Sequence, residues 1–260
     1  MGKKSNAWLL LLLIIFTISI QQGFPPSFIE HVPRKYLINA VLYPQNLTLD
    51  VKLHFYYLND KAESFTKLYF HFFPNSAYFR EYGGGVNRIT IYGERKRLDY
   101  RFKKDGSVLE VNLGEELNPF ERINLTINFR LIIPRARGRY GYYSNVFAFG
   151  NWYPVLAVYD EEGWSLYPYS IYGESFYSEA AFYDVRISVP SGFIVAATGE
   201  LVGKYVQENR VVYHWRVDLA RDFAWVASKN YVVKDAKYSL SDGEVKISVY
   251  LLKEYEEYYK

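Results

Sequence analysis

The amino-acid sequence predicts an all-β protein built from large antiparallel sheets that pack face to face or curl. Two long segments, 47–57 and 123–133, carry an apolar residue at every second position with mainly polar residues between them, which is typical of strands with one buried face. Turn-forming pairs at 105–106 and 242–243, both Asp-Gly, separate shorter apolar segments. No part of the body has apolar residues at the 3.6-residue spacing of a helix.

Residues 1–22 predict a hydrophobic leader helix, either a secretory signal peptide or an N-terminal membrane anchor. Two lysines precede an apolar run through residues 8–20, and this order of charge and apolar residues places the body on the extracellular face of the membrane or in secreted form. No small-residue cleavage site precedes Gln21, so both the cleaved and the anchored form stay open. Residues 23–35 contain three prolines and predict a stiff spacer.

Residues 36–252 are expected to form one β-domain. The run 68–73 is apolar on both faces and predicts a central strand, whereas Gly83–Gly85 predicts a flexible connection. Further strands are expected at 36–42, 86–92, 98–102, 108–113, 183–189, 193–198, 211–217, 223–227, 231–238 and 245–251. Residues 253–260, KEYEEYYK, are expected to begin a truncated helix.

Residues 151–182 interrupt this pattern with a long loop that is rich in tryptophan and tyrosine. Pro154, Pro168, Gly163 and Gly173 exclude a regular helix and would interrupt a central strand. Long loops in compact domains are usually functional or disordered, and this aromatic content argues against disorder. We therefore expect the loop to carry the function of the domain.

Composition and charge exclude several classes of protein. The formal net charge is +3, and the basic residues are spread among acids, which gives no support for a nucleic-acid partner. Residues 135–143 alternate arginine with glycine and tyrosine, a pattern that can bind single strands. In an exported domain we expect a loop with carboxylate or lipid-headgroup contacts instead, or a solvated one. The absence of cysteine excludes disulfides and thiolate metal sites.

The sequence contains no catalytic motif of a hydrolase. None of its histidines, His31, His54, His71 and His214, belongs to an H-E-x-x-H zinc motif. A composite site from separate strands stays open, although hydrogen-bonded structural histidines are the simpler expectation. A G-x-S-x-G motif is absent as well, and the chain has no cysteine nucleophile.

The acids of the aromatic loop suggest three alternatives. Asp160, Glu161, Glu162 and Glu174 could act as paired carboxylates of a glycosidase or as calcium ligands, or simply form a solvated edge. The rings of the same loop suit stacking on a sugar or peptide, so a stand-alone extracellular carbohydrate- or peptide-binding module is the second hypothesis. Two glycosylation sequons, at Asn46 and Asn124, are compatible with export.

Several strings, taken in order, resemble the amino-terminal β-domain of the M1, aminopeptidase N-like, zinc metallopeptidases. They are KYLINAVLYPQNLTLDVKLHFYYLND at 35–60, LYFHFFPNSAY at 68–78, WYPVLAVYDEEGW at 152–164, DVRISVP at 184–190, VAATGEL at 195–201 and RDFAWVASKNYVV at 221–233. The resemblance extends from residue 36 to the end of the chain. It implies a saddle-like β-domain of packed sheets, which in that family precedes a thermolysin-like catalytic domain.

The resemblance also implies a supporting role without catalysis. In the family, the zinc ligands, the general-base glutamate and the G-x-M-E-N strand lie in the catalytic domain, and neither motif occurs here. The chain would thus be one part of a truncated or split aminopeptidase, with no catalytic residue and no cofactor of its own. Zinc is expected only in a separate catalytic domain, which would be the partner and would bind the peptide substrate.

In this reading the aromatic loop covers the active-site cleft of that partner. The candidate residues for the substrate cleft or the interface are Asn145, Trp152, Tyr153, Asp160 and Trp164. Asn145 is included because a family residue just before the segment at 152–164, often a glutamine, lines the first substrate pocket.

Overall fold

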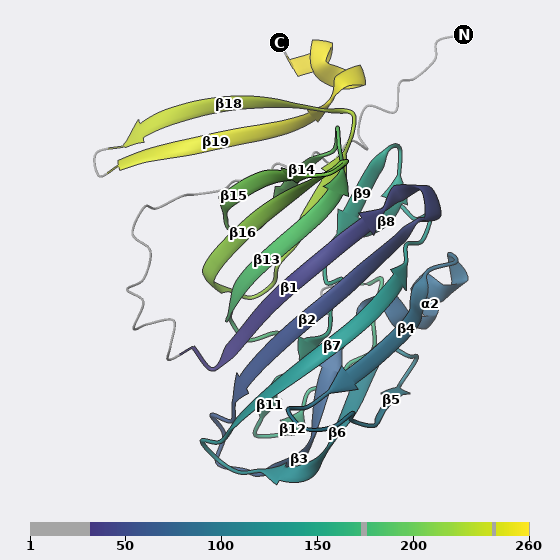
Figure 1. Cartoon of the computed structure of the whole chain (residues 1–260), viewed down its shortest axis with the longest axis vertical. Coiled ribbons are helices and arrows are strands. Elements are labelled where there is room, and N and C mark those ends of the chain that lie inside the picture. The colour runs from purple at the N-terminus through teal and green to yellow at the C-terminus, as the bar shows by residue number, and fades with distance from the viewer. Residues whose placement is uncertain (1–31, 173–175, 241–242, 260) are drawn as a thin grey trace. The chain divides into compact units, whose positions relative to one another are not determined.

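The computed structural model describes residues 32–172, 176–240 and 243–259 (Figure 1). The predicted leader helix and signal or anchor segment, 1–22, lies outside these residues, as does most of the spacer. In the described part of the chain no helix has the length and apolar character needed to cross a membrane. That part consists mainly of strands, which confirms the all-β fold class.

The largest element of the fold is a seven-stranded sheet with the order β15-β16-β13-β1-β2-β7-β4. Its strands are β1 (Arg34–Tyr43), β2 (Thr48–Leu58), β4 (Gly85–Tyr92), β7 (Arg122–Ile132), β13 (Ala181–Pro190), β15 (Glu200–Gln207) and β16 (Arg210–Ala220). β1 and β13 run parallel, with Ile38 opposite Val185, and all other neighbours are antiparallel. The expectation of purely antiparallel pairing was therefore wrong at this one pair, where a long crossing separates the two strands in sequence.

Two four-stranded sheets accompany the large one. The first has the order β10-β3-β6-β5 and the second the order β14-β17-β9-β8. Their strands are β3 (Phe65–His71), β5 (Tyr100–Lys103), β6 (Val108–Leu117), β8 (Tyr140–Tyr143), β9 (Val146–Phe149), β10 (Val155–Leu156), β14 (Ile194–Ala197) and β17 (Trp225–Ser228). The short helices are the 3-10 helices η1 (Pro44–Asn46) and η2 (Phe73–Asn75) and the α-helix α2 (Ala77–Glu81).

One core connects all three sheets. The side chains of β2 alternate between buried and accessible along the whole strand, as the apolar spacing predicts. Phe55 on β2 packs against Phe70 on β3, with ring centroids 5.3 Å apart. In the second small sheet, the rings of Phe149 and Trp225 stack at 4.0 Å. The core therefore lies between the inner face of the seven-stranded sheet and the two smaller sheets.

The structure contains elements that the sequence reading missed. β8 and β9 form a hairpin within and after the Arg/Tyr-rich run that was expected to be a loop, and β15 follows the strand expected at 193–198. β15 was missed because its apolar residues show no alternation and nearly all its side chains are exposed. α2 is a single short turn of helix, and its N-cap Ser76 accepts a hydrogen bond from the Phe79 N–H.

The contacts of the chain divide it between Lys229 and Asn230 into two compact units. The second unit contains the hairpin β18 (Tyr231–Leu240) and β19 (Gly243–Leu252), followed by the 3-10 helix η3 (Lys253–Tyr259). The sequence-based limits placed both strands in the preceding domain, 36–252. A hairpin forms its hydrogen bonds between neighbouring stretches of chain, so it can be a compact unit by itself.

Tyr36 on β1 links the large sheet to the segment that follows β9. Its hydroxyl accepts a hydrogen bond from the Leu156 N–H at 3.0 Å, and its ring stacks on Tyr183 at 5.1 Å. Burial raises the pKa of this phenol far above its usual range, so the hydroxyl keeps its proton.

We predict that Tyr36→Phe lowers the free energy of unfolding by about 1–3 kcal/mol, because the buried Leu156 N–H loses its acceptor. Tyr56→Phe is the matched control, since Tyr56 lies on the neighbouring strand β2 with its ring partly exposed, and a change within about 0.5 kcal/mol is expected. Urea unfolding followed by tryptophan fluorescence measures both. Equal losses of unfolding free energy in the two variants would show that the Tyr36–Leu156 hydrogen bond does not stabilise the fold.

Candidate functional site

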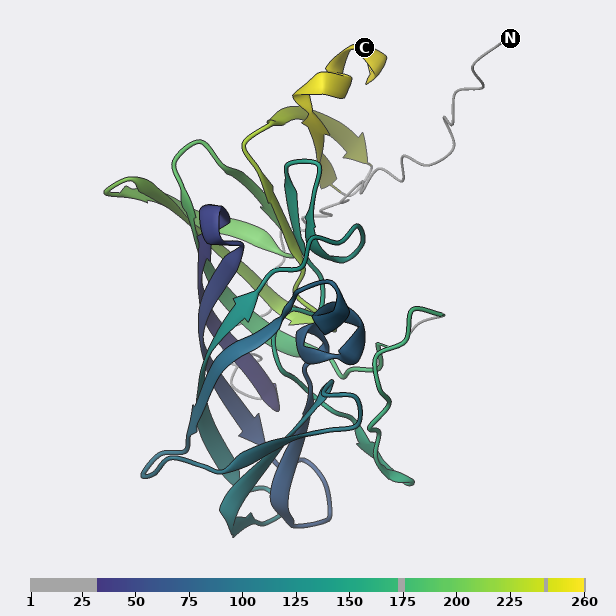
Figure 2. The same ribbon diagram turned by 90° about the vertical axis from the view of Figure 1, so that its right-hand side faces the viewer.

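Residues 151–182 connect β9 to β13 and include all but one of the predicted site residues. They form β10, the small hairpin of β11 (Tyr159–Asp160) and β12 (Gly163–Trp164), and long stretches without regular structure. Figure 2 shows this segment along the side of the body that carries α2. The expected aromatic loop is present, and the structure shows which of its side chains are buried and which are accessible.

Trp152 and Tyr153, two of the predicted site residues, are both 0% exposed. The Trp152 indole N–H donates a hydrogen bond to the Phe223 carbonyl at 3.0 Å, and its ring meets Trp225 edge-on at 5.9 Å. The Tyr153 hydroxyl donates to Asp222 Oδ1 at 3.0 Å. Neither ring offers a face to solvent, so neither can stack on a sugar or a peptide in this structure.

Asp222 is a half-buried acid that the sequence did not mark. Burial raises the pKa of its carboxyl, while hydrogen bonds from the Tyr153 hydroxyl and the Phe223 N–H oppose that rise. No pattern in the sequence distinguishes this aspartate from a surface one, because its burial results from the packing of the strands around it. It anchors the start of the aromatic segment to the residues before β17.

Trp164 and Asp160 lie on the β11–β12 hairpin. The Trp164 ring is half-buried and packs against Phe65 on β3 at 4.9 Å. Asp160 is exposed, and its Oδ1 accepts a hydrogen bond from the Glu162 N–H at 3.1 Å, which closes the turn. Among the described residues, no three acids or histidines come together as metal ligands here, and Glu174 lies outside them.

Asn145 occupies the turn between β8 and β9. Ser144 and Asn145 are the two residues of this turn and have φ values of 46° and 67°. Such a left-handed pair is typical of a two-residue hairpin, and asparagine adopts it readily. The Asn145 carbonyl accepts a hydrogen bond from Ser228 Oγ at 2.7 Å. The structure thus gives this residue a role in the hairpin and does not bring it together with Trp164 or Asp160 in a shared pocket.

Downstream of the β11–β12 hairpin, two hydrogen bonds fix the loop to the first small sheet. His71 Nε2–H on β3 donates to the Ser165 carbonyl at 3.0 Å, and the Tyr169 N–H donates to Ser107 Oγ at 3.2 Å. The Tyr169 ring also packs against Phe79 of α2 at 4.8 Å. These contacts hold residues 165–169 in a defined position without regular secondary structure.

Several large side chains within and beyond the anchored residues 165–169 are accessible. They form what we call the loop surface, which consists of Tyr167, Ile171, Tyr172 and Tyr177, with Tyr172 84% exposed. Apolar and aromatic side chains that gather on an ordered segment are typical of protein interfaces. The sequence reading singled out Trp152 and Trp164 instead, because no periodicity separates buried from accessible aromatics in an irregular segment.

The described histidines each have a separate partner. His54 shares a hydrogen bond with Thr126 Oγ1 at 3.0 Å, and His214 Nε2 with Asp184 at 2.9 Å. Within 32–172, 176–240 and 243–259 no group of three histidines or acids could hold a metal ion, and His31 lies outside these ranges. The described residues therefore do not fit a zinc site.

The buried His71 gives the loop anchor a dependence on pH. Burial lowers the pKa of its imidazole from 6.5 to about 4, since the charged form is poorly solvated there. The unfolded state then binds the proton more readily, and stability falls as the pH drops below the unfolded pKa. We predict that His71→Gln removes a loss of up to about 3 kcal/mol that wild type shows between pH 7 and pH 4.

Urea unfolding at a series of pH values measures this difference. His214→Gln is the control and should retain the loss, because His71 is unchanged. If the free energy of unfolding depended on pH in the same way in wild type and His71→Gln, His71 would not be the cause of the loss.

The fold is similar to that of M1 zinc metallopeptidases. A mutant of the M1 zinc metallopeptidase from Deinococcus radiodurans, bound to a Tyr-Ser-Ala substrate, has a TM-score of 0.52 at 13% identity, covering 82% of this chain and 45% of that chain. The enzyme from the same organism also has a structure with a TM-score of 0.50 at 14% identity over the same shares. A two-domain M1 mutant bound to L-tryptophan gives 0.52 at 12% identity, with 82% and 46% covered.

No family model and no curated protein sequence matches the chain. The likeness to the solved structures shows the fold. This chain spans about half the length of the proteins that it matches, and it covers 45% of the substrate-bound Deinococcus radiodurans enzyme.

Proposed function

We propose that this chain is the non-catalytic amino-terminal β-domain of an M1-like zinc metallopeptidase whose catalytic domain lies outside these 260 residues. The observation that carries the proposal is the likeness to M1 structures over 82% of this chain and 45% of the matched chain. The order of the sequence strings that resemble the family supports the same assignment.

The proposed role is to cover the active-site cleft of the catalytic domain with the loop surface. An interface needs accessible apolar side chains whose positions are already fixed, because ordering a mobile loop on binding lowers affinity. The bonds from His71 to the Ser165 carbonyl and from the Tyr169 N–H to Ser107 hold the backbone beside this surface. Ile171 and Tyr172 then extend beyond the anchor points.

The two domains would have different roles, because only the catalytic domain is expected to supply metal ligands. Zinc, its ligands and the water-activating glutamate would belong to the catalytic domain. This chain would contribute positioning and exclusion of water at the cleft edge through its aromatic side chains. An extracellular or secreted location, with membrane attachment through residues 8–20, is part of the same proposal.

We predict that the chain alone hydrolyses no aminoacyl substrate, and that mixing it with an H-E-x-x-H domain encoded in the same genome yields aminopeptidase activity. Hydrolysis of aminoacyl p-nitroanilides and zinc content per chain are the measurements. Activity or stoichiometric zinc in the isolated chain would contradict the proposal, as would a catalytic domain whose activity is unaffected by this chain.

The loop surface is tested separately. Ile171→Ser combined with Tyr172→Ser should weaken association with the catalytic domain about tenfold or more, because two accessible apolar contacts are lost. Tyr205→Ser with Val206→Ser on β15 is the matched control, since it removes a similar pair of exposed side chains elsewhere, and it should leave association unchanged. Calorimetric titration measures both. Equal weakening by the two pairs would argue against the loop surface as the interface.

A further inference from the structure

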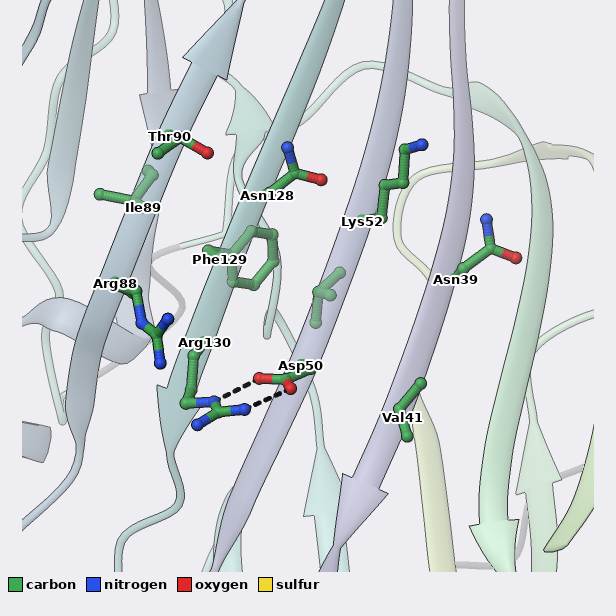
Figure 3. A pocket seen from close by; sticks show the side chains of 11 residues that line it. Asn39, Val41, Asp50, Lys52, Arg88, Ile89, Thr90, Asn128, Phe129 and Arg130 are labelled. Carbon is green, nitrogen blue, oxygen red and sulfur yellow. Dashed lines mark hydrogen bonds and ion pairs between the residues drawn. The ribbon is translucent and has the colours of Figure 1, made fainter.

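The outer face of the seven-stranded sheet contains a groove of about 480 Å³ that the proposed function does not use. It extends over β1, β2, β7 and β4, on the side of the sheet opposite the core (Figure 3). The side chains that line it are mostly polar or charged. They include Asn39, Asp50, Lys52, Arg88, Thr90, Asn128 and Arg130.

Strand register arranges these side chains in two rows across the sheet. One row contains Asn39, Lys52, Asn128 and Thr90, each opposite the next on the neighbouring strand. The adjacent row contains Val41, Asp50, Arg130 and Arg88. The first row offers amide and hydroxyl groups around a lysine, and the second places two guanidinium groups beside one carboxylate.

The two arginines oppose each other because of a β-bulge. The register of β4 against β7 shifts between Val86 and Arg88, so that Val86 faces Leu131 and Arg88 faces Arg130. In a regular strand continuing from Val86, Asn87 would face Arg130 and Arg88 would turn toward the core; the bulge at Asn87 places Arg88 on the outer face instead. Bulges re-aim side chains in this way, often beside functional sites.

Like charges directly opposite each other destabilise a sheet, and an anion bound between them would offset that repulsion. Arg130 donates through Nε and Nη2 to both oxygens of Asp50, which uses one edge of its guanidinium. Figure 3 shows the Arg88 guanidinium turned toward Arg130. Among the described residues, no carboxylate forms an ion pair with Arg88 or Lys52. Three cations and one carboxylate therefore leave the groove with two formal positive charges.

We propose that this groove binds a phosphate or sulfate group carried on a sugar. The tetrahedral oxyanion lies between Arg88 and the remaining Nη1–H donors of Arg130, where planar guanidinium groups match its oxygens. The Asn128 amide and the Thr90 hydroxyl, on the same two strands as the arginines, contact the sugar hydroxyls, and the Lys52 ammonium lies on the next strand beyond them. The groove volume is in the usual range for such a ligand.

The site is independent of the proposed peptidase role. It uses strands β1, β2, β4 and β7 and no residue of the segment 151–182, so a variant in one leaves the other unchanged. Arg88 is exposed, and its replacement removes a like charge opposite Arg130, so the fold should be retained.

The test is calorimetric titration of the full chain with inorganic phosphate, glucose 6-phosphate and glucose at matched ionic strength. Glucose 6-phosphate should bind saturably and more tightly than inorganic phosphate, and glucose should not bind. Arg88→Gln should weaken glucose 6-phosphate binding about tenfold or more, because a charge-assisted contact is lost. Asn128→Ala should weaken glucose 6-phosphate binding and leave inorganic phosphate binding unchanged.

Arg95→Gln is the matched control, since Arg95 is an equally exposed arginine on the connection after β4 and outside the groove. It should bind as wild type does. If Arg95→Gln lost as much affinity for glucose 6-phosphate as Arg88→Gln, the effect would come from net charge alone, and the proposal would be overturned. Absence of saturable binding by both phosphate and glucose 6-phosphate would also overturn it, as would equal binding of glucose.

Discussion

The inner face of the seven-stranded sheet has to be covered, and the rest of the larger unit follows from that constraint. β1, β2, β7 and β13 all direct apolar side chains to this face, including large aromatic rings such as Phe55 and Tyr183. Leaving them in water would forfeit the main stabilising term of folding. The two four-stranded sheets supply the cover, and Tyr36 joins the layers through its hydrogen bond to Leu156.

This constraint explains the division within the aromatic segment. Its first part completes the core, because Trp152 and Tyr153 fill space beside Trp225 and Asp222. Its later part does not add to this core. Hydrogen bonds at Ser165 and Tyr169 attach it to the first small sheet. One segment thus provides both buried packing and an accessible surface, and only the second is available to a partner.

The outer face of the large sheet is subject to different requirements. Its side chains need no cover, so charge and hydrogen bonding decide their arrangement. The bidentate pair of Asp50 and Arg130 is satisfied within the sheet, whereas the bulge in β4 adds Arg88 to the same place. A sheet selected for stability alone would gain from an acid or a neutral residue at this position. The proposed oxyanion would offset the repulsion that remains between Arg88 and Arg130.

The sequence alone determined the all-β fold class and most of the strands. Alternation identified β2 and β7 nearly residue by residue, because a strand with one wet face repeats every two residues. The strings that resemble the M1 family predicted a fold with which the structural likeness agrees, even at 13% identity. Strands without alternation, such as β15, carry no such signal and were not predicted.

The burial of individual aromatics depended on packing between segments distant in sequence. Trp152 is inside because β17 and the residues before it enclose it, and Tyr172 is outside because nothing described covers it. The opposition of Arg88 and Arg130 likewise requires the register of two strands and a bulge. The local sequence determines which secondary structure a residue favours. Which residues surround it in space depends on how the sheets stack, and that packing depends on residues throughout the chain.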